Sequence, residues 1–369
     1  MHLAAFHPFQ LAALAGLSAI DKSPHFLNSI DDTLAAWSAR RNLPRFRRQQ
    51  LRHWLFKRRA SDWAEMSDLP KSLRADLAGS LQLWTTQIVR HTHAADETEK
   101  LLLQLADGGQ IECVLLRGRV RRTICISTQV GCGMGCVFCA SGLDGVERNL
   151  TTGEIVEQIL RLQLLLRREE RLSHVVVMGM GEPLANLDAL LPALAEAHRP
   201  DGLDISTRRI TISTVGLPPA IDRLTRSNAS YRLAISLHAP NDQLRNRLVP
   251  VNDKIGLDAI LASADRYFDA SGRRMTFEYV LLAGVNDSPQ QAHQLTRLLA
   301  GREAMLNVIP YNQVAGLPYQ TPSHASQIQF RKILETGGLR VRFRHRKGDQ
   351  IDAACGQLRR AQQPIVELG

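Results

Sequence analysis

Three of the six cysteines lie close together in the sequence, as Cys132, Cys136 and Cys139 in the spacing C-x3-C-x2-C. The glycines between them let the backbone curl, so that three thiolates can converge on one point. Soft thiolate ligands hold iron and sulfur well, and a four-iron cluster normally takes four cysteines. Three local ligands therefore leave one iron free to bind something other than protein, which suggests a catalytic cluster.

A structural zinc site is the main alternative for these cysteines. It would need a fourth ligand from elsewhere in the chain, such as Cys125 or His345, to complete a tetrahedron. Zinc sites usually pair two C-x2-C knuckles, and this chain has only one. A disulfide framework fits less well, because a chain of 369 residues buries an ample core and shows no secretory signal. The spacing therefore favours the iron–sulfur cluster.

The composition is that of an ordinary globular chain with a basic excess. Of the residues, 44% are hydrophobic and 22% are charged, which is typical of a protein of about two domains. Lys and Arg outnumber Asp and Glu by 46 to 36, and nucleic acid is the first candidate for an anionic partner. No apolar run reaches the length of a membrane span, and no secretory leader is recognisable. We expect a cytoplasmic protein without a membrane partner, whose thiols stay reduced.

Residues 31–90 combine a helical pattern with many basic side chains. Apolar anchors such as Trp54, Leu55 and Phe56 recur among runs of arginine and lysine, which predicts a small helical accessory domain. Its basic face could hold phosphates, although any single arginine there could equally belong to a solvated helix surface. Residues 1–30 match no useful pattern and are interpreted as an N-terminal extension that could pack as an extra short helix.

Residues 91–117 contain two short apolar segments on either side of the turn Asp107-Gly108-Gly109, which predicts a β-hairpin. Neighbouring side chains of a strand point to opposite faces, so Glu112 and Cys113 should face apart. A glutamate in such a strand usually lies on its wet face. We interpret Cys113 as a small core residue.

From residue 122 the sequence alternates between strand and helix patterns. Strands are predicted at 122–127, 173–178, 208–214, 231–237, 274–282 and 304–310, with a further short strand near 339–344. A capping box at Thr151-x-x-Glu154 predicts the start of a helix over 152–170. Repeated β/α units imply an α/β fold with a parallel sheet, and six of them fit an incomplete eightfold barrel over 118–350. Residues 351–369 follow as a C-terminal segment.

Polar residues and glycines cluster where the predicted strands end, and ligands of such sheets gather at these C-terminal ends. These candidates for ligand binding are Gly181, Glu182, Ser213, Ser236, Leu237, His238 and Asn312. Together they suit a zwitterionic ligand with an amine, a carboxylate and a ribose. Taken singly, Ser213 and Asn312 could be ordinary loop residues, and His238 could be a core histidine.

The longer motifs resemble a known family. The cysteine loop, followed by Gly179-Met180-Gly181-Glu182-Pro183, is similar to the radical S-adenosylmethionine (radical SAM) superfamily. The segments Ser236-Leu237-His238-Ala239-Pro240-Asn241-Asp242 and Ile351-Asp352-Ala353-Ala354-Cys355-Gly356-Gln357-Leu358 resemble the adenine-C2 RNA methyltransferases of the RlmN type and their C8-modifying relatives of the Cfr type. The resemblance runs from about residue 31 to about residue 358. The pair Cys125 and Cys355, in these contexts, is specific to the family.

The resemblance implies roles for the site residues. Cys132, Cys136 and Cys139 would bind a [4Fe-4S] cluster, and S-adenosyl-L-methionine would chelate the open iron while Glu182 and its neighbours orient it. Cys355 would carry a methyl group, and Cys125 would resolve the adduct formed there. Glu112 stands thirteen residues before Cys125, as the proposed proton acceptor of the family does. Cys125 is the rival for that role.

The implied reaction fits the chemistry of the base. Adenine C2 is electron-poor and has no nucleophilic lone pair, so it needs a carbon radical rather than an ordinary methyl donor. The resemblance implies methylation of C2 in 23S ribosomal RNA at the peptidyl transferase centre and in transfer RNA next to the anticodon. It also implies an electron donor such as flavodoxin, and we expect a monomer. The alternatives are C8 methylation of the Cfr antibiotic-resistance type and a zinc-stabilised RNA-binding protein without catalysis.

Overall fold

The chain forms an α/β fold built on one large sheet, in a computed structural model that describes residues 25–227, 229–344 and 348–358. The strand order in this sheet is β1-β2-β3-β4-β7-β8-β9-β10-β11-β12, and β5 pairs with β6 separately. The strands are β1 (Gln87–His93), β2 (Glu99–Gln104), β3 (Gln110–Arg117), β4 (Arg122–Cys125), β5 (Gln129–Gly131), β6 (Val146–Asn149), β7 (His174–Val177), β8 (Ile210–Thr214), β9 (Arg232–Ser236), β10 (Met275–Leu281), β11 (Ala304–Pro310) and β12 (Val341–Phe343).

In the large sheet, the strands from β4 to β12 run parallel and confirm the predicted incomplete barrel. β4 pairs with β7, and each later strand of the barrel pairs with its successor as far as β12. β12 lies at the edge of the sheet, so the barrel stays open there. All the predicted strands form, and most are shorter than predicted by one or two residues at one end or at both.

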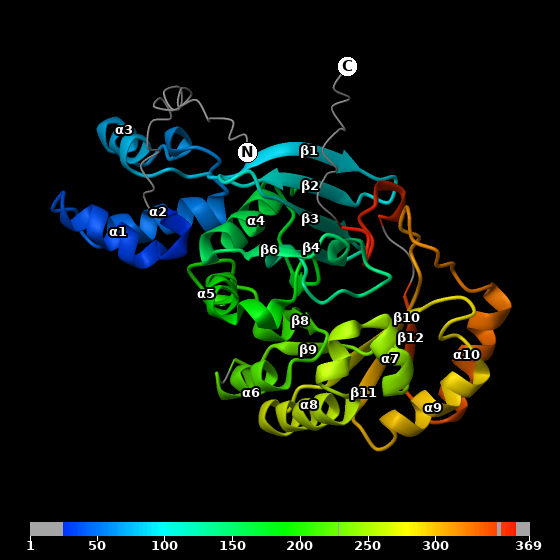
Figure 1. Ribbon diagram of the computed structural model, residues 1–369. Coiled ribbons are helices and arrows are strands. Elements are labelled where there is room, and N and C mark those ends of the chain that lie inside the picture. The colour runs from blue at the N-terminus through cyan, green and yellow to red at the C-terminus, as the bar shows by residue number, and fades with distance from the viewer. Residues whose placement is uncertain (1–24, 228, 345–347, 359–369) are drawn as a thin grey trace, which may run out of the picture.

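The helices of the barrel cover the outer face of the sheet. Figure 1 shows α5, α6, α8 and α9 along the outside of the curved sheet. The helices are α1 (Ile30–Ala39), α2 (Phe46–His53), α3 (Lys71–Ser80), α4 (Thr152–Leu164), α5 (Leu187–His198), α6 (Pro218–Arg226), α7 (Asp242–Leu248), α8 (Leu257–Ser271), α9 (Pro289–Leu299) and α10 (His324–Thr336). None of the described helices is both long enough and apolar enough to cross a membrane.

Helix α4 begins where the capping box predicts. The Thr151 hydroxyl accepts a hydrogen bond from the Glu154 N–H at 3.2 Å, and the Glu154 carboxylate accepts one from the Thr151 N–H at 2.8 Å. The helix ends at Leu164, six residues before the predicted end. The Arg117 guanidinium donates to the Leu165 carbonyl at 2.8 Å. The Arg167 N–H donates to the Glu170 carboxylate at 3.0 Å rather than to a carbonyl of the preceding turn, so the helical pattern does not continue.

Helices α1 to α3 lie where the sequence predicts the helical accessory domain. A short 3-10 helix, Phe26–Asn28, precedes α1 and packs against α4, which fits the extra short helix allowed for residues 1–30. Residues 1–24 lie outside the described residues. Strand β1 begins at Gln87, before residue 90, because residues 87–93 pair with β2.

Strands β2 and β3 confirm the predicted hairpin, and β1 adds a strand that was not predicted. Because β3 also pairs with β4, this extension continues the sheet of the barrel. Glu112 differs from expectation, since it is only 7% exposed. It shares the face of Val114, whose partner across the strands is Cys125, and therefore faces the barrel interior. Cys113 is fully buried on the opposite face, as predicted.

The Glu157 carboxylate on α4 joins three parts of the fold. It is fully buried and accepts hydrogen bonds from Thr85 and Thr86, which lead into β1. It also lies 2.8 Å from Nε2 of His25, at the start of the accessory domain. Burial by itself would raise the pKa of Glu157, but the hydrogen bonds from His25 and the two threonines outweigh it and lower the pKa to about 2.

Replacing Glu157 should weaken the fold in a pH-dependent way. A carboxylate whose pKa falls from 4.5 to about 2 on folding adds stability above pH 4.5, and this stability is lost as the pH falls toward 2. We expect Glu157→Gln to lower the free energy of unfolding by about 3 kcal/mol at pH 7. Urea unfolding, followed by tryptophan fluorescence, should show that the difference from the unsubstituted chain shrinks by more than half at pH 3.

The matched control is Glu335→Gln, because Glu335 is half-exposed on α10 and pairs only with Arg331 among the interactions described for it. This control should change the unfolding free energy little at either pH. An equal loss at pH 7 and pH 3 for Glu157→Gln would contradict the assignment of the effect to the charge.

Candidate active site

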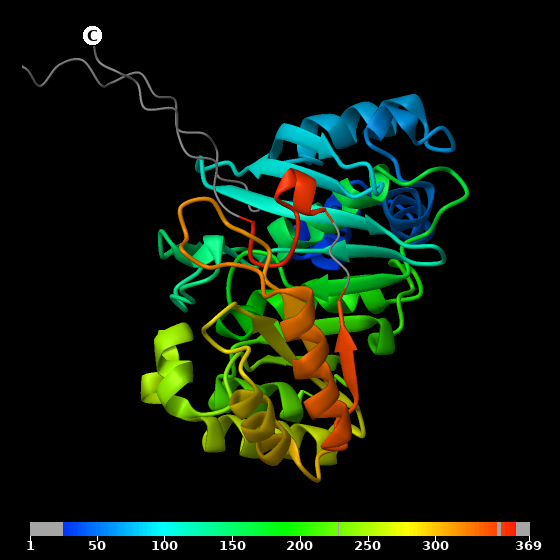
Figure 2. The same ribbon diagram turned by 90° about the vertical axis from the view of Figure 1, so that its right-hand side faces the viewer.

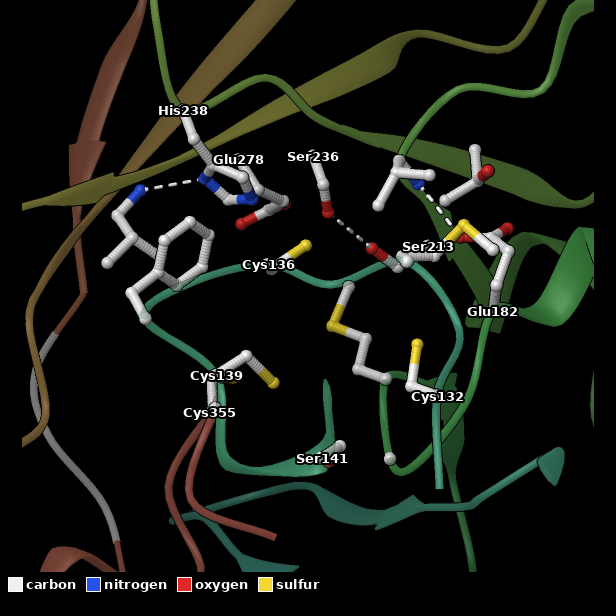
Figure 3. Close-up of a pocket in the computed structure, with 18 of the residues that line it drawn as sticks. Cys132, Cys136, Cys139, Ser141, Glu182, Ser213, Ser236, His238, Glu278 and Cys355 are labelled. Carbon is white, nitrogen blue, oxygen red and sulfur yellow. Dashed lines mark hydrogen bonds between the residues drawn. The ribbon is translucent and has the colours of Figure 1, made fainter. Parts of the chain in front are cut away.

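One pocket gathers most of the predicted site residues at the C-terminal ends of the parallel strands (Figure 3). The predicted residues in its lining are Cys132, Cys136, Cys139, Gly181, Glu182, Ser213, Ser236, His238, Asn312 and Cys355. They come from the C-terminal ends of β8 and β9, from the loops after β5, β7, β9 and β11 and from the C-terminal segment. Glu112, Cys125 and Leu237 are not in this lining.

The three clustered cysteines point into this pocket. Figure 3 shows the sulfurs of Cys132, Cys136 and Cys139 turned toward the same space. Burial raises the pKa of Cys132 to about 12 and also raises the pKa of Cys136. Buried thiols of this kind ionise when a metal centre supplies positive charge.

The arrangement fits a cluster better than a single zinc ion. No three His, Cys, Asp or Glu side chains in the described part of the chain form a ready-made site for one metal ion. A four-iron cluster spreads its thiolates over different irons, so its ligands stand farther apart than those of zinc. Of the two residues considered as a fourth zinc ligand, Cys125 lines a different pocket and His345 lies outside the described residues.

Two glycines let the loop after β7 pass close to the neighbouring backbone. A Cβ atom at Gly179 would lie 2.6 Å from the Ser127 hydroxyl, and one at Gly181 would lie 2.6 Å from the Gln129 Cβ. Gly181 also has a φ of +101°, which side chains disfavour. The Gly-Met-Gly-Glu-Pro motif therefore needs its glycines to place Glu182 at the pocket wall.

Glu182 is buried and held rigidly between two loops. Its carboxylate accepts hydrogen bonds from the Leu184 N–H at 3.0 Å and the Val215 N–H at 2.9 Å. Burial raises the pKa of Glu182, and the hydrogen bonds offset part of that rise. A carboxylate fixed in this way can receive the amine of a ligand without reorganising.

His238 lies at the pocket wall as a neutral ring. Its Nδ1 accepts a hydrogen bond from the Val280 N–H at 3.1 Å, so Nε2 carries the hydrogen and can donate it. Burial lowers the pKa of His238 to about 3, and the nearby Arg245 adds to this effect. The ring packs edge-on against Phe138 of the cysteine loop, with their centroids 4.8 Å apart.

Arg245, which the sequence analysis did not single out, holds the loops after β8 and β9. It is fully buried and donates to the carbonyls of Leu237 at 3.0 Å, Ser236 at 2.9 Å and Val215. Leu237 is itself fully buried, so it contributes packing and this carbonyl rather than a side chain to the pocket. An arginine on the helix after the Ser-Leu-His-Ala-Pro-Asn-Asp segment was the available signal.

The remaining polar residues of the pocket offer hydrogen-bonding groups to a ligand. The hydroxyls of Ser213 and Ser236 lie 3.4 Å apart in the pocket. Asn312 donates from Nδ2 to the Cys355 carbonyl at 3.3 Å, while its buried Oδ1 has no hydrogen-bond partner among the described residues. An unpaired buried acceptor costs stability unless a ligand donates to it. The pocket thus fits a ligand that carries amine and hydroxyl groups.

The segment that carries Cys355 is tied to the cysteine loop. The Ala140 N–H donates to the Gly356 carbonyl at 2.8 Å, and the Ser141 hydroxyl donates to the Leu358 carbonyl at 2.5 Å. Figure 2 shows this segment, in red, beside the antiparallel strands. These contacts place an exposed thiol at the pocket, next to the predicted cluster.

Cys355 also lines a second pocket, together with Cys125. The two pockets share Met178, Glu278, Ile309, Asn312 and Cys355, so they adjoin one another. Burial raises the pKa of Cys125 to about 12, and the nearby Cys355 sulfur adds to the rise. The structure therefore brings together the two cysteines that the sequence places 230 residues apart.

Glu112 is linked to the Cys355 segment through a lysine. The Lys100 ammonium lies 2.8 Å from the Glu112 carboxylate and donates to the Asp352 carbonyl at 3.0 Å. Both charged side chains are buried, so removal of either would leave an uncompensated buried charge. Lys100 was not recognised in the sequence, because it lies in a strand among leucines.

Glu278 is a further site residue that the sequence analysis missed. It lies on β10 and lines both pockets described above. It is 6% exposed and accepts a hydrogen bond from Asn307 Nδ2 at 2.8 Å. Burial raises the pKa of Glu278, and the hydrogen bond from Asn307 and the charge of Arg344 offset part of this. An acidic residue within an apolar strand was the signal for it.

Comparison with protein families matches two parts of the chain. The Radical SAM superfamily matches residues 126–295, which include the cysteine loop and the strands as far as β10. The family described as the ribosomal RNA large subunit methyltransferase N-terminal domain matches residues 26–83. This second match begins at the short helix that packs against α4.

Similar proteins cover nearly the whole chain. A probable dual-specificity RNA methyltransferase RlmN of Rhodopirellula baltica is 60% identical over 336 residues, which are 91% of each chain. One of the same description from Symbiobacterium thermophilum is 47% identical over 86% of each chain. The crystal structure of a radical SAM methyltransferase from Sphaerobacter thermophilus superposes with a TM-score of 0.88 at 42% identity, over 91% of this chain and 99% of that one.

A side chain at Gly181 should weaken binding of S-adenosyl-L-methionine. Gly181→Ala would place a methyl group against Gln129 and strain a positive φ, so the Glu182 loop must move away from the pocket. We expect affinity for S-adenosyl-L-methionine to fall at least tenfold by equilibrium dialysis of the iron-loaded protein. The control is Gly284→Ala, which has a similar backbone strain at φ +67° but meets open space. Equal affinity in the two variants would contradict the prediction.

Proposed function

The chain belongs to the RlmN family of radical SAM RNA methyltransferases, and we propose from this premise that it methylates C2 of adenine in both 23S ribosomal RNA and transfer RNA. The relatives named as probable dual-specificity enzymes support two RNA substrates. The target would lie in the peptidyl transferase centre in ribosomal RNA and next to the anticodon in transfer RNA. The observation that carries the proposal is the position of Cys355, which lines the cysteine-loop pocket and the pocket of Cys125.

The enzyme uses a [4Fe-4S] cluster and S-adenosyl-L-methionine, which together supply a methyl group and the carbon radical that activates it. We assign the cluster to Cys132, Cys136 and Cys139, whose sulfurs face one space. We propose that the polar groups of S-adenosyl-L-methionine are bound by the residues held in place around the pocket. These residues are Gly181, Glu182, Ser213, Ser236, Leu237, His238 and Asn312.

Cys355 and Cys125 would act at different steps of the reaction. Cys355 holds the methyl group near the cluster and presents it to adenine C2, which an ordinary methyl donor cannot modify. Cys125 would then attack the Cys355 sulfur: an S–S bond forms, the bond from that sulfur to the methylene carbon breaks, and this carbon takes a proton to become the methyl group of the base. The unpaired electron of the adduct would return to the cluster, and external thiols would reduce the disulfide. Because burial raises the pKa of Cys125 to about 12, its thiol keeps its proton until this step.

We assign the proton acceptor to Glu112 rather than to Cys125. A protonated thiol has no capacity to take the proton that leaves the base, whereas the Glu112 carboxylate is ion-paired with Lys100. Glu112 faces the same side of the sheet as Cys125. The bond from Lys100 to the Asp352 carbonyl couples this carboxylate to the segment of Cys355. Lys100 therefore acts as a positioning residue.

The partners follow from the same assignment. The reaction requires an RNA substrate and an electron donor, for which a flavodoxin is the candidate. A cytoplasmic location would keep the Cys125 and Cys355 thiols reduced between cycles. We propose that the chain acts as a monomer.

Mass spectrometry of adenosines tests the substrates. Cells without the gene should lack 2-methyladenosine in 23S ribosomal RNA and in transfer RNA, and a gene with Cys355→Ala should restore neither. Loss from ribosomal RNA alone would remove the transfer RNA substrate. A gene-dependent 8-methyladenosine would place the enzyme with the Cfr type, and unchanged bases in both RNAs would refute the proposed activity.

Removal of Cys125 should trap the product on the enzyme. We expect Cys125→Ala to accumulate RNA bound to Cys355, visible as a shifted band of labelled RNA on a denaturing gel. The matched control is Cys113→Ala, because Cys113 is buried in the core and lines neither pocket. It should release methylated RNA as the unsubstituted enzyme does. Release of free methylated RNA by Cys125→Ala would contradict the role of Cys125.

A further inference from the structure

Seven arginines gather at the end of the barrel opposite the cysteine loop. They precede or begin parallel strands, or lie on or directly after β12, and they line one pocket. We call this set the arginine mouth, and its members are Arg121, Arg208, Arg232, Arg273, Arg274, Arg342 and Arg344. Because the strands of the barrel are parallel, their N-terminal ends share one edge and bring these residues together.

The arginine mouth differs from the paired arginines of the outer helices, and within the described ranges Glu278 is the one acidic residue in its lining. On the outer helices, Arg266 lies 2.9 Å from Asp222 and Arg302 lies 3.0 Å from Asp265. No arginine of the mouth forms an ion pair with a carboxylate of the described residues, although Arg273 donates to a backbone carbonyl. Such a concentration of unpaired positive charge repels itself and is stabilised when an anion binds.

The mouth opens into the interior of the barrel. Its pocket shares Arg121, Val176, Met178, Glu278 and Arg344 with the pocket that contains Cys125 and Cys355. That pocket in turn adjoins the cysteine-loop pocket. Alternate residues of a strand share one face, and on β10 these are Thr276, Glu278 and Val280. They line this path one after another, from the arginine mouth to the cysteine-loop pocket. A continuous route therefore leads from the arginines to Cys355.

We propose that the arginine mouth binds the phosphates that flank the target adenine, so that the base reaches Cys355 from the N-terminal side of the strands. This proposal rests on the proposed function, because it takes RNA as the substrate. Each guanidinium can hold a phosphate through two parallel hydrogen bonds. Several arginines spread around one opening fit the successive phosphates of a single-stranded loop better than one small anion.

The barrel interior admits a base but disfavours a phosphate. Val176 and Met178 offer apolar surface on the route, and Glu278 is the acidic residue in the linings of all three pockets. Asn307 lies on the same route, and its buried Oδ1 has no hydrogen-bond partner in the described part of the chain. An amide acceptor of this kind can receive an exocyclic amine such as that of adenine.

The test compares two triple variants with the same change of charge. Arg208→Gln/Arg232→Gln/Arg342→Gln removes three charges of the mouth, and Arg223→Gln/Arg266→Gln/Arg331→Gln removes three arginines that are paired on the outer helices. The iron-loaded enzymes would methylate an RNA hairpin that carries the adenine. We expect the mouth variant to raise the KM for RNA at least tenfold and to reduce the slope of log affinity against log salt by about 2. The control should change neither.

Arginine footprinting of the unsubstituted enzyme gives an independent measurement. A dicarbonyl reagent should modify Arg208, Arg232 and Arg342 more slowly when RNA is bound, whereas Arg223 should react at the same rate. This result remains informative if the triple variant fails to fold, as its melting temperature and iron content would reveal. Inorganic phosphate at the same concentration should protect these arginines weakly, and equal protection would instead indicate a site for a small anion.

The outcomes separate the two proposals. If the unsubstituted enzyme methylates no RNA, the proposed function fails. If it methylates RNA but the mouth variant keeps the KM and salt dependence of the control and RNA protects none of the three arginines, the arginine mouth is not the substrate entry. The adenine must then approach from another side of the barrel.

Discussion

The hydrogen bond from the Ala140 N–H to the Gly356 carbonyl is the contact on which the site depends. It joins the end of the cysteine loop to a segment that arrives more than two hundred residues later in the sequence. With it, and with the bond from Ser141 to the Leu358 carbonyl, the thiol stands where two pockets meet. The methyl carrier is therefore positioned by the loop that binds the cluster.

The same segment is held from the other side by the antiparallel extension. Lys100 on β2 donates to the Asp352 carbonyl, and the Gly348 N–H donates to Asp96 at 3.1 Å. The extension thus does more than enlarge the sheet, because it supplies Glu112 and supports the loop of Cys355. Since Glu157 ties the entry of β1 to α4 and the accessory domain, a disturbance there would reach the active site through β1 and β2.

The sequence alone predicted the features that depend on local patterns of residues. The capping box located the start of α4, the apolar segments located the parallel strands, and the cysteine spacing located one wall of the pocket. It failed where tertiary contacts decide the outcome. Glu112 looks like a surface residue until its buried ion pair with Lys100 is known. Helix α4 stops at Leu164, where Glu170, held by Arg117 and Arg122, takes the Arg167 N–H. Lys100 carries no local signal, because its role is set by two partners far away in the chain.

The two ends of the parallel sheet carry opposite chemistry, and this limits how a nucleotide can enter. Residues at the C-terminal strand ends are occupied with the cluster and its ligand, and Cys355 covers them from one side. The N-terminal ends carry unpaired arginines, which also lower the pKa of His174 after burial has lowered it. Between the ends, the buried Glu278 makes the passage of a phosphate costly. A neutral base can pass where its backbone cannot, so the charge pattern itself favours a flipped-out adenine.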